Sequence, residues 1–170
     1  MALLRLIDRL SLASACVAAV LVVPLILGTT YEVFSRYVLG NPTIWSFELS
    51  YMLMGASFLL GLGYALQIGQ HVNVDIFYAR FSPGGKAIAY VVGYALFLPV
   101  LLWLDVEVIR YTYGAFRSAE TTGASSWNPV VWPFRATWSL GLAVFALQAI
   151  AELARAIRGL SGRALEGQRP

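Results

Sequence analysis

Four long stretches without a charged residue or histidine constrain the fold of this 170-residue chain more than any other feature. They are Leu10–Tyr31, Leu49–Gln70, Ala87–Leu104 and Ala136–Ala151. A helix of about 20 apolar residues crosses about 30 Å of hydrocarbon. The fourth stretch is short, but Arg135 is the sole charge between Thr121 and Ala151, and its long side chain can reach the membrane surface. The sequence therefore predicts an all-α integral membrane protein with four transmembrane helices, at about residues 10–31, 49–70, 87–104 and 130–151.

The composition excludes several other classes of protein. Hydrophobic residues make up 59% of the chain and charged residues 12%, against about 45–50% and about 25% in soluble domains. So few charges argue against a soluble enzyme or a disordered chain, and the single cysteine, Cys16, cannot form an intrachain disulfide. The basic residues flank the apolar stretches instead of forming a stripe. The lipid bilayer is therefore a predicted partner, and nucleic acid is not.

The basic residues also predict how the helices are oriented in the membrane. Cytoplasmic segments of membrane proteins carry an excess of Lys and Arg. The more basic side would hold Arg5, Arg9, Arg80, Lys86, Arg155, Arg158, Arg163 and Arg169, and the other side Arg36, Arg110, Arg117 and Arg135. Both termini are therefore predicted to lie in the cytoplasm, with a membrane domain over residues 1–158 and a flexible tail over 159–170.

Three dipeptides resemble helix starts, because each places a capping side chain before a proline that the first helical turn tolerates. They are Asn41-Pro42, Ser82-Pro83 and Asn128-Pro129. The second, third and fourth helices are expected to begin near them.

The third helix is expected to continue beyond Leu104 as an amphipathic segment. Val106, Ile109, Tyr113 and Phe116 follow at helical spacing, while the charged residues take another face. A helix over residues 87–117 would be about 46 Å long. It would exceed the membrane, so we expect a strong tilt, a break or an interfacial segment.

Ionisable residues are absent from the middle of the predicted spans. Glu32, Glu48, His71, Asp105 and Glu107 all lie at or beyond the predicted ends. Carriers usually bind their substrates and ions through polar groups near the membrane centre. The chain therefore suits a structural or accessory subunit better than a transport pathway of its own.

A stripe of small residues on the second helix suggests close helix packing. Ser57, Gly61, Ala65 and Gly69 recur every four residues, and such stripes let helix backbones approach each other in lipid. The stripe suits packing inside this chain as well as docking against a partner.

Two pairs of charged residues mark the helix ends. Glu32 and Arg36 have the i,i+4 spacing of a helical ion pair, and Arg36 is also placed to bridge to Glu48 at the start of the second helix. His71 and Asp75 have the same spacing, and a turn cap is the simplest interpretation. A single histidine without a cysteine cluster cannot build a zinc site or a bis-histidine haem site. We therefore predict no cofactor, no metal and no enzymatic activity.

The order and spacing of several motifs resemble the small permease subunit of tripartite ATP-independent periplasmic (TRAP) transporters, the DctQ-type family. The motifs are Arg36-Tyr37-Val38, Asn41-Pro42, Trp45-Ser46-x-Glu48, Gly61-x-Gly63-Tyr64-Ala65 and Gly69-x-His71-Val72-x-Val74-Asp75. The resemblance covers about residues 5–157. Phe47 departs from the pattern, since relatives often carry an acidic residue there.

The resemblance implies an accessory subunit in the bacterial inner membrane. Its partners would be a large permease subunit, which carries the sodium and substrate sites, and a periplasmic solute-binding protein that delivers an organic acid. The small subunit would pack on the scaffold of the large one and stabilise it. The alternative from another class is a membrane anchor subunit of a redox enzyme, against which the single histidine argues.

Overall fold

The computed structural model describes residues 2–69 and 83–166, which form four long α-helices. Their bounds are α1 (Ala2–Tyr37), α2 (Ser46–Gln67), α4 (Pro83–Ser118) and α5 (Trp132–Glu166). Each helix is long and apolar enough to cross a membrane. This confirms the predicted all-α membrane fold with four spans. The helix α5 also continues eight residues into the segment expected to be a flexible tail, whose last four residues lie outside the described part.

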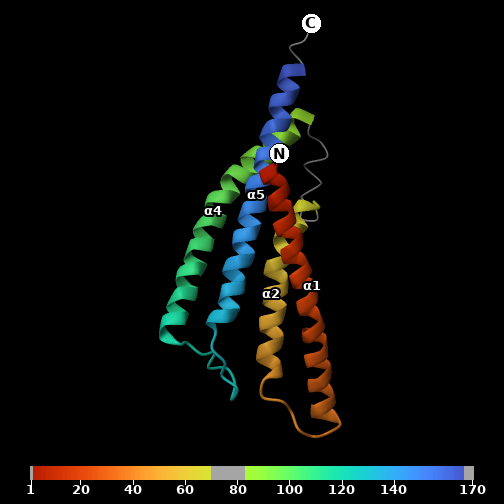
Figure 1. Cartoon of the computed structure of the whole chain (residues 1–170), viewed down its shortest axis with the longest axis vertical. Coiled ribbons are helices and arrows are strands. Elements are labelled where there is room, and N and C mark those ends of the chain that lie inside the picture. The colour runs from red at the N-terminus through yellow and green to blue at the C-terminus, as the bar shows by residue number, and fades with distance from the viewer. Residues whose placement is uncertain (1, 70–82, 167–170) are drawn as a thin grey trace.

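The four helices stand side by side in the order α4, α5, α2, α1 (Figure 1). The helix α1 packs on α2, α2 on α5 and α5 on α4, and a smaller contact joins α1 to α5. The start of α1 and the end of α5 lie at one end of this row, which we call the inner end, following the orientation expected from the basic residues. The α1–α2 and α4–α5 connections lie at the opposite, outer end.

The hydrophobic core lies where α5 meets its two neighbours. Its buried members are Leu66, Leu98, Leu101, Leu142, Phe145, Ala146 and Ala149. Most other large apolar side chains are exposed. A membrane protein can leave such side chains exposed, because they contact the apolar lipid chains and not water.

The three helices begin at or a few residues after the expected dipeptides, but only α4 begins at its proline. The helix α4 begins at Pro83, whereas α2 begins four residues after Pro42, behind Trp45, whose side chain makes no capping bond. Asn128 has a φ of 44°, and its Oδ1 accepts a hydrogen bond from the Gly123 N–H at 2.8 Å. Asparagine side chains stabilise turns as readily as helix starts. The α4–α5 loop uses Asn128 in this way, and α5 begins later.

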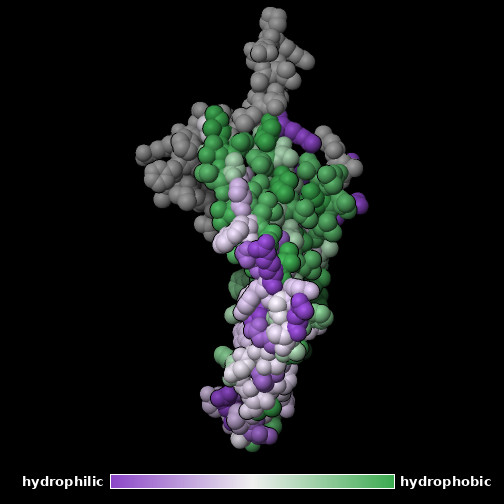
Figure 2. All heavy atoms as spheres, turned by 90° about the vertical axis from the view of Figure 1, so that its left-hand side faces the viewer, coloured by the Kyte–Doolittle hydropathy of each residue, from purple (hydrophilic) through white to green (hydrophobic). Residues whose placement is uncertain are grey.

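The amphipathic continuation of the third span is found as part of one unbroken helix. The helix α4 runs from Pro83 to Ser118 without interruption, so the break, one of the three expected alternatives, is not observed. Figure 2 shows this side of the molecule: its inner half is covered by apolar residues, and its outer half carries residues of intermediate hydropathy with hydrophilic ones among them. The composition of the surface therefore changes partway along α4.

Candidate functional site

The predicted site residues fall into three places in the structure. Arg36, Asn41, Trp45 and Glu48 lie at the outer end, and the small-residue stripe lies on α2. His71 and Asp75 lie outside the described residues, so the expected turn cap remains a prediction.

Arg36 does not bridge to Glu48, contrary to the expectation from the sequence. It forms an ion pair with Glu32, one turn earlier in α1. The other carboxylate oxygen of Glu32 accepts hydrogen bonds from the N–H of Thr43, at 2.9 Å, and from its hydroxyl. Glu32 thereby joins α1 to the loop before α2, and Arg36 is held at this loop instead of at α2.

Asn41 and Trp45 fix the same loop on α1. The Asn41 N–H donates to the Ser35 carbonyl at 3.0 Å, and the Ser35 hydroxyl donates back to the Asn41 carbonyl. The Trp45 ring stacks on Tyr31, with 6.1 Å between the ring centres and 12° between the planes. These contacts set the approach of α2 to α1 at the outer end.

Glu48 is completely buried in the first turn of α2. Both of its carboxylate oxygens accept from the Thr122 hydroxyl, at 2.9 and 3.0 Å. The positive end of the helix dipole favours an anion at this position. Thr122 belongs to the α4–α5 loop, so Glu48 ties that loop to the start of α2.

A second outer ion pair was not expected from the sequence. The buried Arg135 of α5 donates to both carboxylate oxygens of Glu120 at 2.7 Å and to the Tyr111 hydroxyl at 2.7 Å. Its guanidinium carbon lies 3.6 Å from the centre of the Tyr111 ring, a cation–π contact. The hydrogen bonds from Arg135 lower the pKa of the Glu120 carboxyl. The 15-residue separation of the pair gave no local signal in the sequence.

The small-residue stripe does not face the other helices of the chain at Gly61. A Cβ added at Gly61 would meet no atom within 4 Å, and Ser57 and Ala65 are half-buried on the same side of α2. Gly69 belongs to the end of the helix, where its φ of +70° is favourable for glycine and its N–H donates to the Leu66 carbonyl. The stripe therefore comprises Ser57, Gly61 and Ala65, which are all half-buried. Because there is free space beside Gly61, we call this side the open face of α2.

Other glycines make the close contacts inside the bundle. A Cβ on Gly141 would lie 2.7 Å from the backbone of Leu59, and one on Gly63 would lie 3.0 Å from Val144. The helices α2 and α5 therefore approach so closely that a side chain at Gly141 would collide with the neighbouring backbone. The every-fourth-residue pattern on α2 did not reveal these positions.

A polar network joins α1 to α5 at the inner end. Gln148 is fully buried; its Oε1 accepts from Ser11 at 2.9 Å, and its amide nitrogen donates to Asp8 at 3.2 Å and to Glu152 at 2.9 Å. Arg155 donates to both oxygens of Asp8 at 2.6 Å and also pairs with Glu152.

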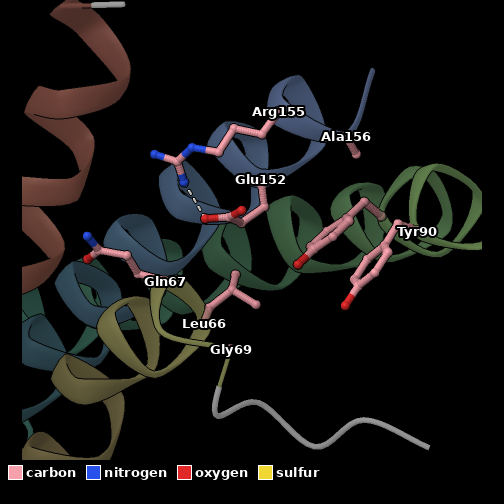
Figure 3. A pocket seen from close by; sticks show the side chains of 8 residues that line it. Leu66, Gln67, Gly69, Tyr90, Glu152, Arg155 and Ala156 are labelled. Carbon is pink, nitrogen blue, oxygen red and sulfur yellow. Dashed lines mark hydrogen bonds and ion pairs between the residues drawn. The ribbon is translucent and has the colours of Figure 1, made fainter. Parts of the chain in front are cut away.

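A cavity of about 300 Å³ lies beside this network, between α2, α4 and α5 (Figure 3). It is lined by Leu66, Gln67, Gly69, Tyr90, Tyr94, Glu152, Arg155 and Ala156. The two charged residues of the lining form an ion pair with each other, so their charges offset.

The site contacts serve mainly to connect helices and loops. Within residues 2–69 and 83–166, no group of three His, Cys, Asp or Glu side chains is placed to hold a metal ion. Glu48, Arg135 and Gln148 each bond to a residue distant in the sequence. This chemistry fixes the bundle at both ends.

Comparison with known families gives one match. Residues 25–159 match the family described as tripartite ATP-independent periplasmic transporters, DctQ component. This stretch includes both outer ion pairs, the Glu48 contact and the open face of α2. A search of curated proteins found no match.

Proposed function

Since the chain belongs to the DctQ family, the small permease component of TRAP transporters, we propose that it is the accessory subunit of a sodium-coupled importer of organic acids. It lies in the bacterial inner membrane, packs on the scaffold of the large permease subunit and stabilises it. A periplasmic solute-binding protein delivers the substrate to the complex. The family match over residues 25–159 carries this proposal.

The buried polar contacts support a scaffolding role. Glu48, Arg135 and Gln148 hold loops and helix ends together through partners within the chain. A transport pathway needs polar groups that are free to exchange partners with a substrate or ion. Groups occupied in this way suit a static subunit.

The open face of α2 is the surface that we propose for docking. Ser57, Gly61 and Ala65 let a partner helix approach closely, and the neighbouring Phe58, 71% exposed, offers a large apolar side chain to a groove on the partner.

Purification of the tagged chain from native membranes in mild detergent, with mass spectrometry, tests the proposed function. We expect a much larger multi-span protein in stoichiometric amount, and sodium-dependent uptake of an organic acid that requires this chain. Recovery of a soluble flavin or iron–sulfur subunit instead would make the chain an enzyme anchor.

The variant Gly61→Leu tests the docking face, and Gly93→Leu is its control, because a Cβ added at either position meets no atom of this chain within 4 Å. We expect Gly61→Leu to reduce recovery of the large subunit several-fold, with an unchanged melting temperature for the small subunit alone. Equal recovery with both variants would remove this face of α2 from the interface while leaving the function standing.

A further inference from the structure

The contacts between neighbouring helices show which residues lie level with one another along the bundle. Between α1 and α2, the Ser14 hydroxyl donates to the Leu60 carbonyl at 2.7 Å. Between α2 and α5, Gly141 lies against the backbone of Leu59. Ser14 of α1 and Gly141 of α5 therefore stand at nearly the same height.

The height of α4 follows from its contacts with α5. The Phe97 and Phe145 rings lie 5.8 Å apart, and the Thr112 and Ser139 hydroxyls lie 3.2 Å apart. Gly141 lies between Ser139 and Phe145 in the sequence, so the part of α4 opposite it lies between Thr112 and Phe97, within one helical turn of Leu104.

The apolar stretches of the two outermost helices are therefore staggered. Ser14 lies near the inner end of the stretch Leu10–Tyr31, whereas Leu104, at the same height, ends the stretch Ala87–Leu104. Outward from Ser14, α1 remains apolar for roughly 17 more residues, or about 25 Å. Val20 and Leu27 are 66% and 64% exposed there.

Outward from Leu104, charged side chains appear on the exposed surface of α4 among apolar ones such as Ile109 and Phe116. Glu107 and Arg110 form an ion pair at 2.8 Å, with side chains 41% and 71% exposed. In Figure 2 the outer half of this side carries scattered hydrophilic residues among ones of intermediate hydropathy. An ionised side chain at the bilayer centre costs about 3 kcal/mol or more. A flat bilayer perpendicular to the helices would either surround this pair with lipid or leave the outer half of α1 in water.

We infer that the row of helices leans in the membrane, so that one flat bilayer covers the apolar stretch of α1 and that of α4. In this position the outer half of α4, from Glu107 to Ser118, emerges from the lipid together with the α4–α5 loop. Residues of α1 at the same height remain inside the bilayer. A lean is usual for membrane helices, which are tilted by about 20° on average. It also accommodates helices of 36 residues, the length of α1 and α4, which measure about 54 Å against a core of about 30 Å.

Two exposed residues at one height distinguish a leaning bundle from an upright one. Trp138 of α5 lies next to Gly55 of α2, which is five residues outward from Leu60. On α1, Val20 lies about as far outward from Ser14 as Gly55 lies from Leu60. On α4, Tyr113 follows Thr112, which contacts Ser139, the neighbour of Trp138. Tyr113 and Val20 are therefore at about the same height, and they are 61% and 66% exposed. An upright bundle holds both residues at one depth, whereas a leaning bundle holds Val20 in lipid and Tyr113 in water.

The experiment uses the full-length chain with its one cysteine removed by Cys16→Ala and a single cysteine introduced by Val20→Cys, Tyr113→Cys or Leu96→Cys. Leu96, 71% exposed, lies within the apolar stretch of α4. A membrane-impermeant maleimide is added to open membrane sheets, so that both sides are accessible, and labelling is normalised to the denatured protein. We expect labelling at position 113 to be at least tenfold faster than at positions 20 and 96.

Equal labelling at positions 20 and 113 would overturn the inference, because it would place both at one depth. Slow labelling at all three positions would also overturn it, since the outer half of α4 would then be covered. Fast labelling at position 96 would show that α4 does not enter lipid through its apolar stretch, and the inference would fail for that reason.

Discussion

At the outer end, Arg135 is the residue that we expect to contribute most to the stability of the fold. Its side chain is 10% exposed and bonds to Glu120 and to the Tyr111 hydroxyl. We expect Arg135→Gln to lower the free energy of unfolding by about 2 kcal/mol, because hydrogen bonds to charged groups are lost where water replaces them poorly. Thermal unfolding of the purified chain measures this loss. Arg110→Gln is the control, since its exposed pair contributes about 0–1 kcal/mol, and an equal loss in both variants would contradict the prediction.

The same pair predicts how stability depends on pH. The hydrogen bonds from Arg135 lower the pKa of Glu120 in the folded chain, so the unfolded chain binds a proton at this site more readily. The stabilisation from Glu120 is therefore complete above the usual carboxyl range and is lost as the pH falls through the lowered pKa. We expect the difference in melting temperature between the native chain and Glu120→Gln to shrink from neutral pH to about pH 3. A constant difference would show that the Glu120 charge does not contribute.

At the scale of helices, the contact of α5 with α2 depends on the absence of a side chain at Gly141. A Cβ there would lie 2.7 Å from the Leu59 backbone. Gly141→Ala should therefore push the helices apart and destabilise the chain by about 1–3 kcal/mol. In Gly114→Ala the added Cβ meets nothing within 4 Å, and alanine is favoured over glycine in a helix by up to about 1 kcal/mol. Melting temperatures that fall for position 141 and hold or rise for position 114 would confirm the contact.

The helices could be predicted from the sequence, but their inward faces could not. Long stretches without charge located all four spans, and the spacing of Val106, Ile109 and Tyr113 predicted that the third helix continues outward. A helix that is apolar all round carries little sign of which side meets its neighbours. For this reason the regular spacing of small residues drew attention to Gly61, which is open, instead of Gly63 and Gly141, which touch the neighbouring helices.

Helix starts and charge pairs were harder to predict, because both depend on the path of the loops between the helices. Asn128 serves a turn instead of a helix start. Thr43 holds Glu32, and with it Arg36, at the loop, so Arg36 does not reach Glu48. A sequence shows which residues can pair, while the path of the loop determines which of them meet.

At the scale of the whole molecule, the two ends of the described chain are joined by Asp8 and Arg155. These residues are 147 positions apart, and the pair connects α1, the first helix of the chain, to α5 across the inner end. Both side chains are partly exposed, at 24% and 34%, so water screens the charges. We expect a double-mutant cycle with Asp8→Asn and Arg155→Gln to give a coupling of about 1 kcal/mol.

Arg155 also binds Glu152. The substitution Arg155→Gln removes that contact both in the native chain and in Asp8→Asn, so its contribution cancels in the cycle. The four chains are compared by thermal unfolding, and hydrogen exchange of α1 shows where the change occurs. Faster exchange should appear at the inner end of α1 and not near Tyr31, because the outer end is held by its own contacts with the α1–α2 loop. A coupling near zero, or faster exchange along the whole of α1, would show that the packing of α1 on α2 alone fixes its position.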